Sequence, residues 1–311
     1  MFCSFLVLGI KMIEVVMVGS VALDSIQTPF GKAVETLGGS ISYASHACSF
    51  FAKPGIVAVV GEDFPQKHIK LFEERGIDVS GLKKEMGKTF RWNGKYEFDM
   101  NIAETLSTEL NVFQSFNPVL PENYRKAKYV FLGNIDPELQ LNVLKQMENP
   151  ELVVSDTMNY WIENKKEKVM EVIKTVDIAL MNDAEARMLF NTPNLFKAAK
   201  EVLKLDSDYA IIKKGEHGAI MCTASSCFSS PAYPLENVVD PTGAGDSFAG
   251  AFIGYLAKTR DLSEGNVRKA MVYGSVVASL NAEGLGMEKF KEVTQEKIEE
   301  RFNEFKKIVE F

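Results

Sequence analysis

Residue types that mark redox or metal chemistry are scarce in this chain. Its 311 residues include only four cysteines and three histidines. The histidines are too widely separated to suggest a zinc site, and the cysteines show no Cys-x-x-Cys spacing. This pattern favours a reducing compartment without a structural metal, so we expect a cytoplasmic protein. The four cysteines are Cys3, Cys48, Cys222 and Cys227.

Positive charge and long apolar runs are also scarce. The formal net charge is −7 and the pI is near 5.3, which argues against a nucleic-acid partner. The apolar run Phe2–Ile10 is too short to span a bilayer as a helix. No positive residue precedes this run and no small-residue cleavage site follows it, so it does not read as a signal peptide. We expect no membrane partner, and we interpret residues 1–11 as an extension before a natural start at Met12.

What is present is an alternation of short apolar runs with amphipathic stretches. This alternation predicts βαβ units and an α/β fold, with a mostly parallel central sheet flanked by helices on both faces. No linker or repeat interrupts it, so we expect a single domain over residues 12–311. The expected strands are Glu14–Val18, Ile56–Val60, Tyr129–Leu132, Leu152–Ser155, Ile178–Met181 and Tyr209–Lys213. The expected helices are Ser40–Phe51, Gln66–Arg75, Pro137–Met147, Lys165–Thr175, Leu195–Leu205, Ser247–Lys258, Ser263–Asn281 and Thr294–Val309.

Two segments, about 25–37 and 87–113, lack the helical period. The second contains a hairpin signal with Asn93-Gly94 at its centre. Both segments suit a small sheet that projects from the main one.

The stretch Asp240–Phe248 carries the strongest chemical signal. Its glycines, Gly243 and Gly245, precede an apolar helical segment, so the free backbone amides of a helix N-terminus would face an anion. Asp246 lies in the first turn of that helix, where a carboxylate could accept a proton from an attacking hydroxyl or merely complement the helix dipole. A dinucleotide fingerprint is excluded because Phe248 stands where its third glycine belongs.

The run Asp-Pro-Thr-Gly-Ala-Gly-Asp at 240–246 resembles the second signature of the ribokinase-like (PfkB) carbohydrate and nucleoside kinases. The resemblance covers nearly the whole chain from about Met12. It implies that Asp246 is the catalytic base and that the amides of Gly243, Ala244 and Gly245 form the anion hole. It further implies ATP and Mg²⁺ as cofactors, K⁺ as a further one, and a β-lid through which two copies could form a homodimer.

On the acceptor side, Asp24 follows the first strand, where open α/β sheets bind ligands. An aspartate there either holds adjacent hydroxyls or caps a turn; the resemblance favours holding the sugar. Gly38 and Gly39 are similar to the di-glycine of the family's first signature. Tyr43 departs from that signature, because many sugar kinases carry asparagine at its position.

An aromatic residue at that position, with Arg91, Trp92 and Tyr96 in the expected small sheet, suggests a nucleoside acceptor. Aromatic residues are equally ordinary on hairpins, so a free pentose or hexose remains the alternative. Asp99 and Asn101 are further candidates for acceptor contacts.

On the donor side, Asn182 and Glu185 resemble the family's Asn-x-x-Glu motif, which implies that Glu185 binds Mg²⁺ through water. The same two residues would also form a helix capping box. Lys213, Gly215 and Gly218 look like the family's nucleotide loop, although many members have threonine at the position of Lys213. That lysine could neutralise the γ-phosphate or could be a solvated charge at a strand end.

Three more positions rest on the resemblance alone. Tyr273 falls near the adenine pocket, and Asp240 and Thr242 fall near the loop that binds a monovalent cation. The sequence thus predicts an ATP-dependent kinase that phosphorylates a primary hydroxyl of a sugar or nucleoside. The alternative is a catalytically silent binding or regulatory protein on the same fold.

Overall fold

A computed structural model describes residues 12–310 of the chain, so the expected extension at residues 1–11 lies outside the described residues. The main sheet has nine strands in the order β13-β12-β11-β10-β9-β8-β1-β4-β5. From β5 to β11 neighbouring strands are parallel, and β12 and β13 pair antiparallel at one edge. The bounds are β1 Val15–Val18, β4 Pro54–Gly61, β5 Asp78–Glu85, β8 Tyr129–Leu132, β9 Leu152–Ser155, β10 Ile178–Asn182, β11 Tyr209–Lys213, β12 Ala219–Cys222 and β13 Cys227–Ser230.

The central strands are apolar along their whole length because both faces of the sheet are covered. Every residue of β1, β4, β8 and β9 is buried. Such continuous Val- and Ile-rich runs are typical of parallel sheets between two helical layers.

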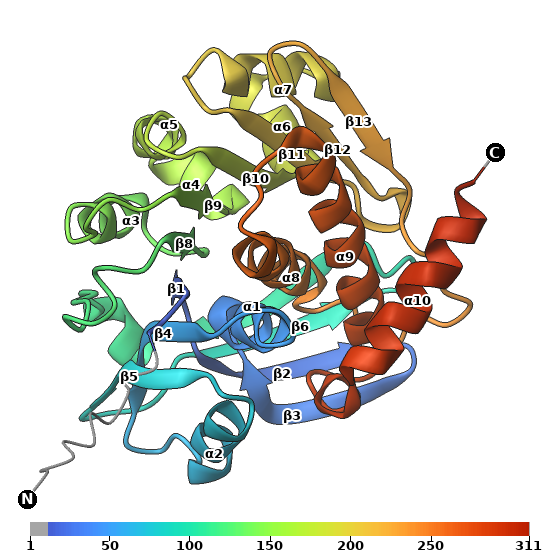
Figure 1. The fold of residues 1–311 in the computed structure, drawn as a ribbon. Helices are drawn as coiled ribbons and strands as arrows, with labels where there is room; N and C mark the ends of the chain where they lie inside the picture. Colours follow the sequence, from blue (N-terminus) through green and yellow to red (C-terminus); the bar gives the residue numbers. More distant parts are fainter. Residues whose placement is uncertain (1–11, 311) are drawn as a thin grey trace, which may run out of the picture.

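Helices cover the sheet on both sides, as Figure 1 shows. One apolar core lies between the sheet and the first layer, and a second core lies between the sheet and the other layer. The first layer contains α1 Ser40–Cys48, α2 Gln66–Glu74, α8 Ala244–Thr259, α9 Glu264–Ala282 and α10 Gln295–Ile308. The other layer contains α3 Pro137–Leu144, α4 Asn159–Asn164, α5 Lys166–Ile173, α6 Asp183–Phe190 and α7 Leu195–Leu203. The predicted α/β class and helical layers are confirmed.

A second sheet of four strands, which we call the small sheet, forms from the two irregular segments. Its order is β3-β2-β6-β7, with bounds β2 Ala22–Thr28, β3 Gly31–Gly38, β6 Arg91–Tyr96 and β7 Ala103–Glu109. The predicted turn at Asn93-Gly94 is wrong. Both residues lie inside β6, at a register shift in its pairing with β7, and the chain reverses over residues 97–102 instead.

Helix α8 packs against its neighbours through glycines. A Cβ on Gly250 would lie 1.9 Å from the carbonyl oxygen of Ala44 in α1. A Cβ on Gly274 of α9 would lie 2.9 Å from the side chain of Phe248. Because no side chain stands between them, α1, α8 and α9 approach closely and bury α8 from Ser247 to Ala257.

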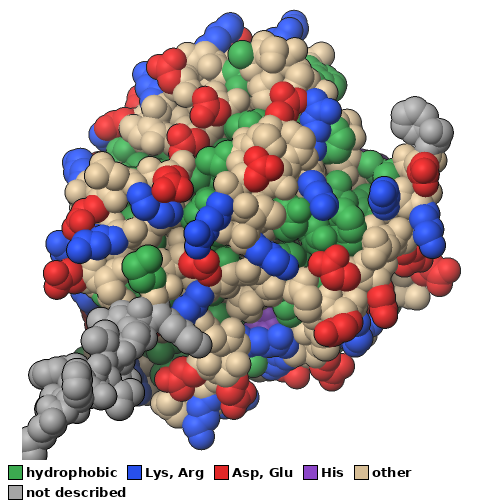
Figure 2. All heavy atoms as spheres, viewed as in Figure 1, with side chains coloured by type: hydrophobic (Ala, Val, Ile, Leu, Met, Phe, Trp, Pro, Cys, Tyr) green, Lys and Arg blue, Asp and Glu red, His purple; other side chains and the backbone are tan. Residues whose placement is uncertain are grey.

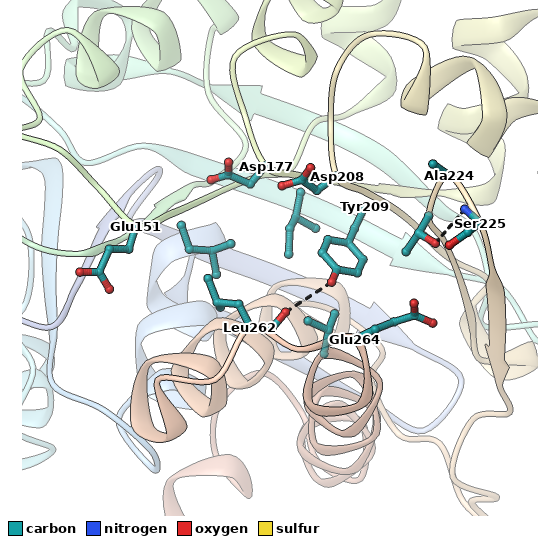
Figure 3. A pocket seen from close by; sticks show the side chains of 12 residues that line it. Glu151, Asp177, Asp208, Tyr209, Ala224, Ser225, Leu262 and Glu264 are labelled. Atoms are coloured by element: carbon teal, nitrogen blue, oxygen red, sulfur yellow. Dashed lines mark hydrogen bonds between the residues drawn. The ribbon is translucent and has the colours of Figure 1, made fainter.

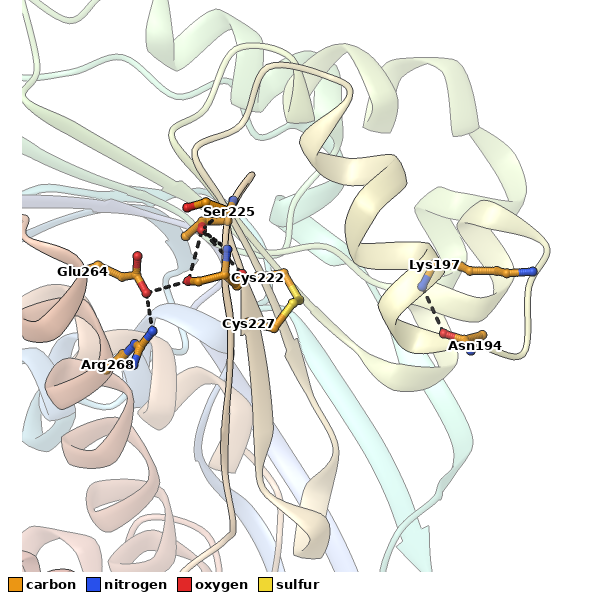
Figure 4. Close-up of a disulfide and its surroundings, with 9 residues drawn as sticks. Asn194, Lys197, Cys222, Ser225, Cys227, Glu264 and Arg268 are labelled. Atoms are coloured by element: carbon orange, nitrogen blue, oxygen red, sulfur yellow. Dashed lines mark hydrogen bonds and ion pairs between the residues drawn. A yellow bond between two sulfur atoms is a disulfide. The ribbon is translucent and has the colours of Figure 1, made fainter.

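The cysteine pattern needs a correction. Cys222 and Cys227 face each other in the β12–β13 hairpin and form a disulfide (Figure 4). Their separation of five residues matches no metal or redox spacing, and the pairing follows from the hairpin register. The cysteine spacing alone did not predict this bond.

Acidic and basic side chains are interspersed over the face seen in Figure 2. Among the helices of residues 12–310, none is both long and apolar enough to cross a membrane.

Candidate active site

The carboxyl ends of three neighbouring parallel strands bring polar side chains together at one edge of the main sheet. Asp156 directly follows β9, Asn182 ends β10 and Lys213 ends β11. The first two strands pair in parallel, as do the second and third, so their ends meet at the same edge. Asp156 is absent from the sequence prediction, although its position after an expected strand is the signal that marked the other two.

The N-terminus of α8 faces the same edge. Gly243 is its N-cap and has φ 72°, a left-handed conformation that favours glycine. No side chain caps this end. The amide of Ala244 donates to the carbonyl of Pro241 at 3.0 Å, so of the predicted anion hole only the amides of Gly243 and Gly245 are left for a ligand. The hydroxyl of Ser247, in the same turn, is buried and has no hydrogen-bond partner.

Lys213 reaches the helix N-terminus. A Cβ on Gly245 would lie 3.3 Å from its Nζ. The same ammonium donates a hydrogen bond to Oδ2 of Asp156. The side chains of Lys213 and Asp156 are only 15% and 6% exposed, so the interpretation of Lys213 as a solvated charge is wrong.

Asp246 is partly exposed in the first turn of α8. The protein packed around its carboxyl raises its pKa to about 7; Asp156 raises it further and Lys213 lowers it. A carboxyl with a pKa near neutrality is suited to take and return a proton.

Asn182 and Glu185 form the predicted capping box at the start of α6. The Asn182 side chain accepts from the backbone amide of Glu185 at 2.8 Å, and Glu185 accepts from the backbone amide of Asn182 at 2.7 Å. Burial raises the pKa of Glu185 to about 8, Asp156 raises it further and Lys213 lowers it. The capping box therefore explains the geometry of Asn182 and Glu185. The Glu185 carboxyl also interacts electrostatically with Asp156 and Lys213.

The acceptor candidate Asp24 lies in β2 of the small sheet, not at the end of β1. It is 4% exposed and its Oδ2 accepts from the amide of Gly39 at 3.3 Å, while Oδ1 has no partner. A Cβ on Gly38 would collide with this carboxylate, so glycine is required there. Burial raises the pKa of Asp24 to about 7; the Gly39 bond opposes this, and Asp240 and Asp246 add to it.

Tyr43 connects the acceptor side to the helix N-terminus. Its ring lies so close to Gly243 that a Cβ there would be 2.3 Å from the ring. Tyr43 is 1% exposed and its hydroxyl has no partner. Burial raises the pKa of this phenol, and the carboxyls of Asp24, Asp240 and Asp246 also raise it. A buried, unpartnered hydroxyl beside an unpartnered carboxylate oxygen is suited to bind a polar ligand.

Arg91 does not extend into this group of residues. Its guanidinium pairs with Glu35 at 2.8 Å and with Asp63 at 2.8 Å, and it donates to the carbonyl of Thr89. These bonds join β6 to β3 and to the loop after β4, so the predicted acceptor contact of Arg91 is corrected to a structural one.

Asp99 and Asn101 lie in the exposed turn between β6 and β7. The amide of Asn101 donates to Glu216 at 3.4 Å, and a Cβ on Gly215 would lie 3.4 Å from Asn101. The tip of the small sheet thus touches the predicted nucleotide loop through the side chain of Asn101.

The predicted nucleotide loop begins at Gly215, which has φ 55°, and ends at Gly218, which has φ 80°. The amide of Lys214 donates to the carbonyl of Gly218 and closes the loop at 2.7 Å.

Tyr273 lies elsewhere. Its ring stacks between Tyr255 and Phe302 at centroid distances of 4.5 and 4.2 Å, and its hydroxyl donates to Glu299. Because the ring is buried in this aromatic stack, its assignment to an adenine pocket is corrected.

Asp240 and Thr242 form a closed turn before α8. The two carboxylate oxygens of Asp240 accept from the amides of Thr242 and Gly286, at 2.9 and 2.7 Å. The carbonyl of Thr242 accepts from Asn281, whose buried Oδ1 has no partner. These bonds fix the loop that precedes the anion hole.

A pocket of about 390 Å³ lies at the opposite edge of the sheet, around the amino ends of β9, β10 and β11 (Figure 3). Carboxylates from Glu151, Asp177, Asp208 and Glu264 surround it, and none of the predicted site residues lines it.

Comparison with known proteins agrees with this geometry. Residues 5–291 match the model of the pfkB family of carbohydrate kinases. The chain belongs to the PfkB family. PfkB kinases are phosphotransferases, and the fold described above is the one that members of this family share.

Relatives in the PfkB family differ in acceptor. A cytidine kinase from Thermococcus kodakarensis is 30% identical over 259 residues, 81% of this chain and 92% of that kinase. A nucleoside kinase from Methanocaldococcus jannaschii and a ribokinase from Lactococcus lactis are each 27% identical, over 90% and 91% of this chain and 93% and 96% of theirs.

Solved structures share the fold at lower identity. The Methanocaldococcus jannaschii nucleoside kinase superposes with a TM-score of 0.75 at 22% identity, covering 94% of this chain and 99% of that one. A putative ribokinase II from E. coli, solved with ATP and Mg²⁺, gives 0.77 at 16% identity, covering 94% and 100%.

Proposed function

We propose that this protein is an ATP-dependent kinase that phosphorylates a primary hydroxyl of a sugar or nucleoside, with Asp246 as the general base. The observation that carries the proposal is the position of Asp246. It is a partly exposed carboxyl one turn into a helix whose uncapped N-terminus faces a buried lysine.

In the proposed reaction Asp246 accepts the proton of the acceptor hydroxyl. The hydroxyl oxygen then attacks the γ-phosphorus of ATP in line, the bond to the β-phosphate oxygen breaks, and ADP leaves. The amides of Gly243 and Gly245, which have no partner within residues 12–310, donate to the transferred group, where negative charge is concentrated.

The donor side offers few direct metal ligands. Within residues 12–310, no three His, Cys, Asp or Glu side chains lie close enough together to hold a metal ion. Magnesium commonly keeps several waters and binds through phosphates, so the carboxylate of Glu185 fits an ion held through water. Such an ion neutralises charge on the phosphates.

An uncharged acceptor that carries adjacent hydroxyls suits the other side. Asp24 Oδ1 accepts a hydrogen bond from one hydroxyl of the acceptor, and the Tyr43 hydroxyl forms a hydrogen bond with a second polar group of the acceptor. Both protein atoms are buried and have no partner among the described residues. The carboxylates of Asp24 and Asp246 repel a phosphorylated or acidic sugar. The cytidine and nucleoside kinases among the relatives support a nucleoside, and the ribokinase supports ribose.

The test is release of ADP over a panel of cytidine, other nucleosides, ribose, fructose and sugar acids. Asp246→Asn is expected to lower kcat by about 10²–10⁴-fold while ATP binding remains. The control is Asp208→Asn, an exposed carboxyl at the opposite edge of the sheet.

Two results would contradict the proposal. Wild-type turnover in Asp246→Asn would remove this residue from the mechanism. Nucleotide binding without turnover of any acceptor would instead favour the silent binding protein.

A further inference from the structure

Positive charge converges at the N-terminus of α8. Unpaired amides place the positive end of the helix dipole there, and a second cation at such a position is unfavourable by itself. Yet the ammonium of Lys213 lies against Gly245 in this first turn, in a largely buried setting. A lysine fixed beside free amides is expected where an anion binds between them.

The position of the ammonium is set by Asp156. The Asp156 amide donates to the carbonyl of Leu132, and its own carbonyl accepts from the Gln140 side chain. Its Oδ1 accepts from the amide of Thr157 at 3.0 Å, which leaves Oδ2 for Lys213. Each polar group of Asp156 is therefore engaged, and the carboxylate is held at a fixed point after β9.

The pair is more than a local ion pair. Burying two charges is costly, and replacing such a pair with apolar side chains often stabilises a protein. Burial acts to lower the pKa of Lys213, but the carboxylates of Asp156, Glu185 and Asp246 raise it by more. Lys213 therefore also balances the charges of Glu185 and Asp246.

We propose that Asp156 is a positioning residue that fixes the Lys213 ammonium at the N-terminus of α8, where Lys213 contacts the phosphoryl group as it is transferred. The inference rests on the proposed kinase function and adds a cationic contact to the amides of the anion hole. Asp156 acts only through Lys213.

The first experiment separates phosphate binding from folding. We measure by calorimetry the affinity of Lys213→Met for AMP and for an ATP analogue with a β,γ-imido bridge. The analogue is expected to bind at least tenfold more weakly, while AMP, which lacks the outer phosphates, binds as in the wild type. Lys204→Met, at an exposed lysine directly after α7, is the control and is expected to change neither affinity.

The second experiment measures the effect of each substitution on kcat. Lys213→Met is expected to lower kcat by about 10²–10³-fold, as does the loss of one donor to a transition-state charge. Asp156→Asn is expected to lower it by about 10–100-fold through misplacement of the ammonium. Lys213→Arg keeps the charge and restores part of the activity.

A double variant decides the role of Asp156. If it acts through Lys213 alone, Asp156→Asn has no further effect on kcat in the Lys213→Met background. The double variant removes both charges of the Asp156–Lys213 pair. We therefore expect it to fold even if Lys213→Met alone is unstable because it leaves the Asp156 carboxylate unpaired.

Equal loss of AMP and analogue affinity, or additive effects in the double variant, would overturn the inference. Failure of the wild type to phosphorylate any acceptor would overturn the proposed function instead, and the ratio of the two affinities would still test the phosphate contact.

Discussion

At the scale of single residues, three carboxyls of the candidate active site, from β2, α8 and α6, are held in environments that favour their neutral form. The pKa is raised to about 7 for Asp24 and Asp246 and to about 8 for Glu185, in each case chiefly by burial. Both the activity and the stability of the protein should therefore depend on pH near neutrality.

The pH dependence of turnover should follow Asp246. As a base it must be ionised, so kcat/KM should rise about tenfold per pH unit up to about pH 7 and then level off. The measurement is a rate profile from pH 5 to 9 at saturating ATP. A flat profile across pH 6 to 7 would contradict the role of Asp246 as base.

The stability of the free protein should change in the opposite sense. A folded pKa above the unfolded value of 3.8 means that the contribution of Asp24 to stability is complete below about pH 4. That contribution is lost as pH rises through about 7. Asp24→Asn removes this buried charge and should stabilise the protein at pH 8, by at most about 4 kcal/mol for a shift of about three units.

Thermal melts of Asp24→Asn at pH 5 and pH 8 test this, with acceptor affinity as the second readout. The stabilisation should be clearly larger at pH 8 than at pH 5, where only part of the Asp24 contribution is lost, and acceptor binding should weaken at both values. Equal melting temperatures of variant and wild type at pH 8 would rule out a charged, buried Asp24.

The sequence located the residues that belong to a local motif and missed those that depend on distant partners. Asp246 and Gly243 were predicted because a run of seven residues carries their chemistry. Asp156 is a lone aspartate after a strand, and its importance depends on Lys213, 57 residues away. Arg91 was misassigned because its partners Glu35 and Asp63 come from other elements.

At the scale of elements, α6 combines a structural cap with the donor side. Asn182→Ala should destabilise the protein by about 1–2 kcal/mol through loss of the N-cap. Asn182→Ser retains a cap and should recover most of that stability. If the Asn182–Glu185 pair also positions the donor, the serine variant should remain impaired in KM for ATP.

Urea unfolding and steady-state kinetics on the two variants measure these effects. Full recovery of both stability and KM in Asn182→Ser would show that the Asn182–Glu185 pair only caps α6 and does not position the donor.

The inner strands β1, β4 and β8 to β11 of the main sheet were predicted because burial on both faces gives continuous apolar runs, whereas β5, β12 and β13 were missed. The small sheet was predicted from the two irregular segments, but without the bounds of its strands, and its turn was misplaced. Asn-Gly is a strong local signal for a turn, but parallel pairing with β2 holds Asn93 and Gly94 in β6. Cross-strand partners, which a local signal does not contain, decide the outcome.

At the scale of the whole molecule, we propose that the small sheet is the surface through which two copies associate. It carries apolar side chains that are 49–74% exposed, and β7 is exposed along nearly its whole length. An exposed edge strand with apolar side chains is prone to pair with another chain. These side chains are Phe30, Val34, Ile102 and Leu106.

Light scattering after gel filtration should therefore report a dimer for the wild type. Leu106→Lys should shift it to monomer, whereas Met86→Lys, an exposed apolar position outside the small sheet, should not. A wild type that remains monomeric at high concentration would contradict this surface.

Helix α8 is buried from Ser247 to Ala257 and packs against α1 and α9 at glycines that leave no room for a side chain. The proposed base and anion hole therefore lie on a helix that we expect to unfold only together with the core. Heat should destroy catalysis and tertiary structure at one temperature, without an earlier loss of activity. New acceptor preferences should then arise through changes in the small sheet, since alterations along this helix would cost the fold itself.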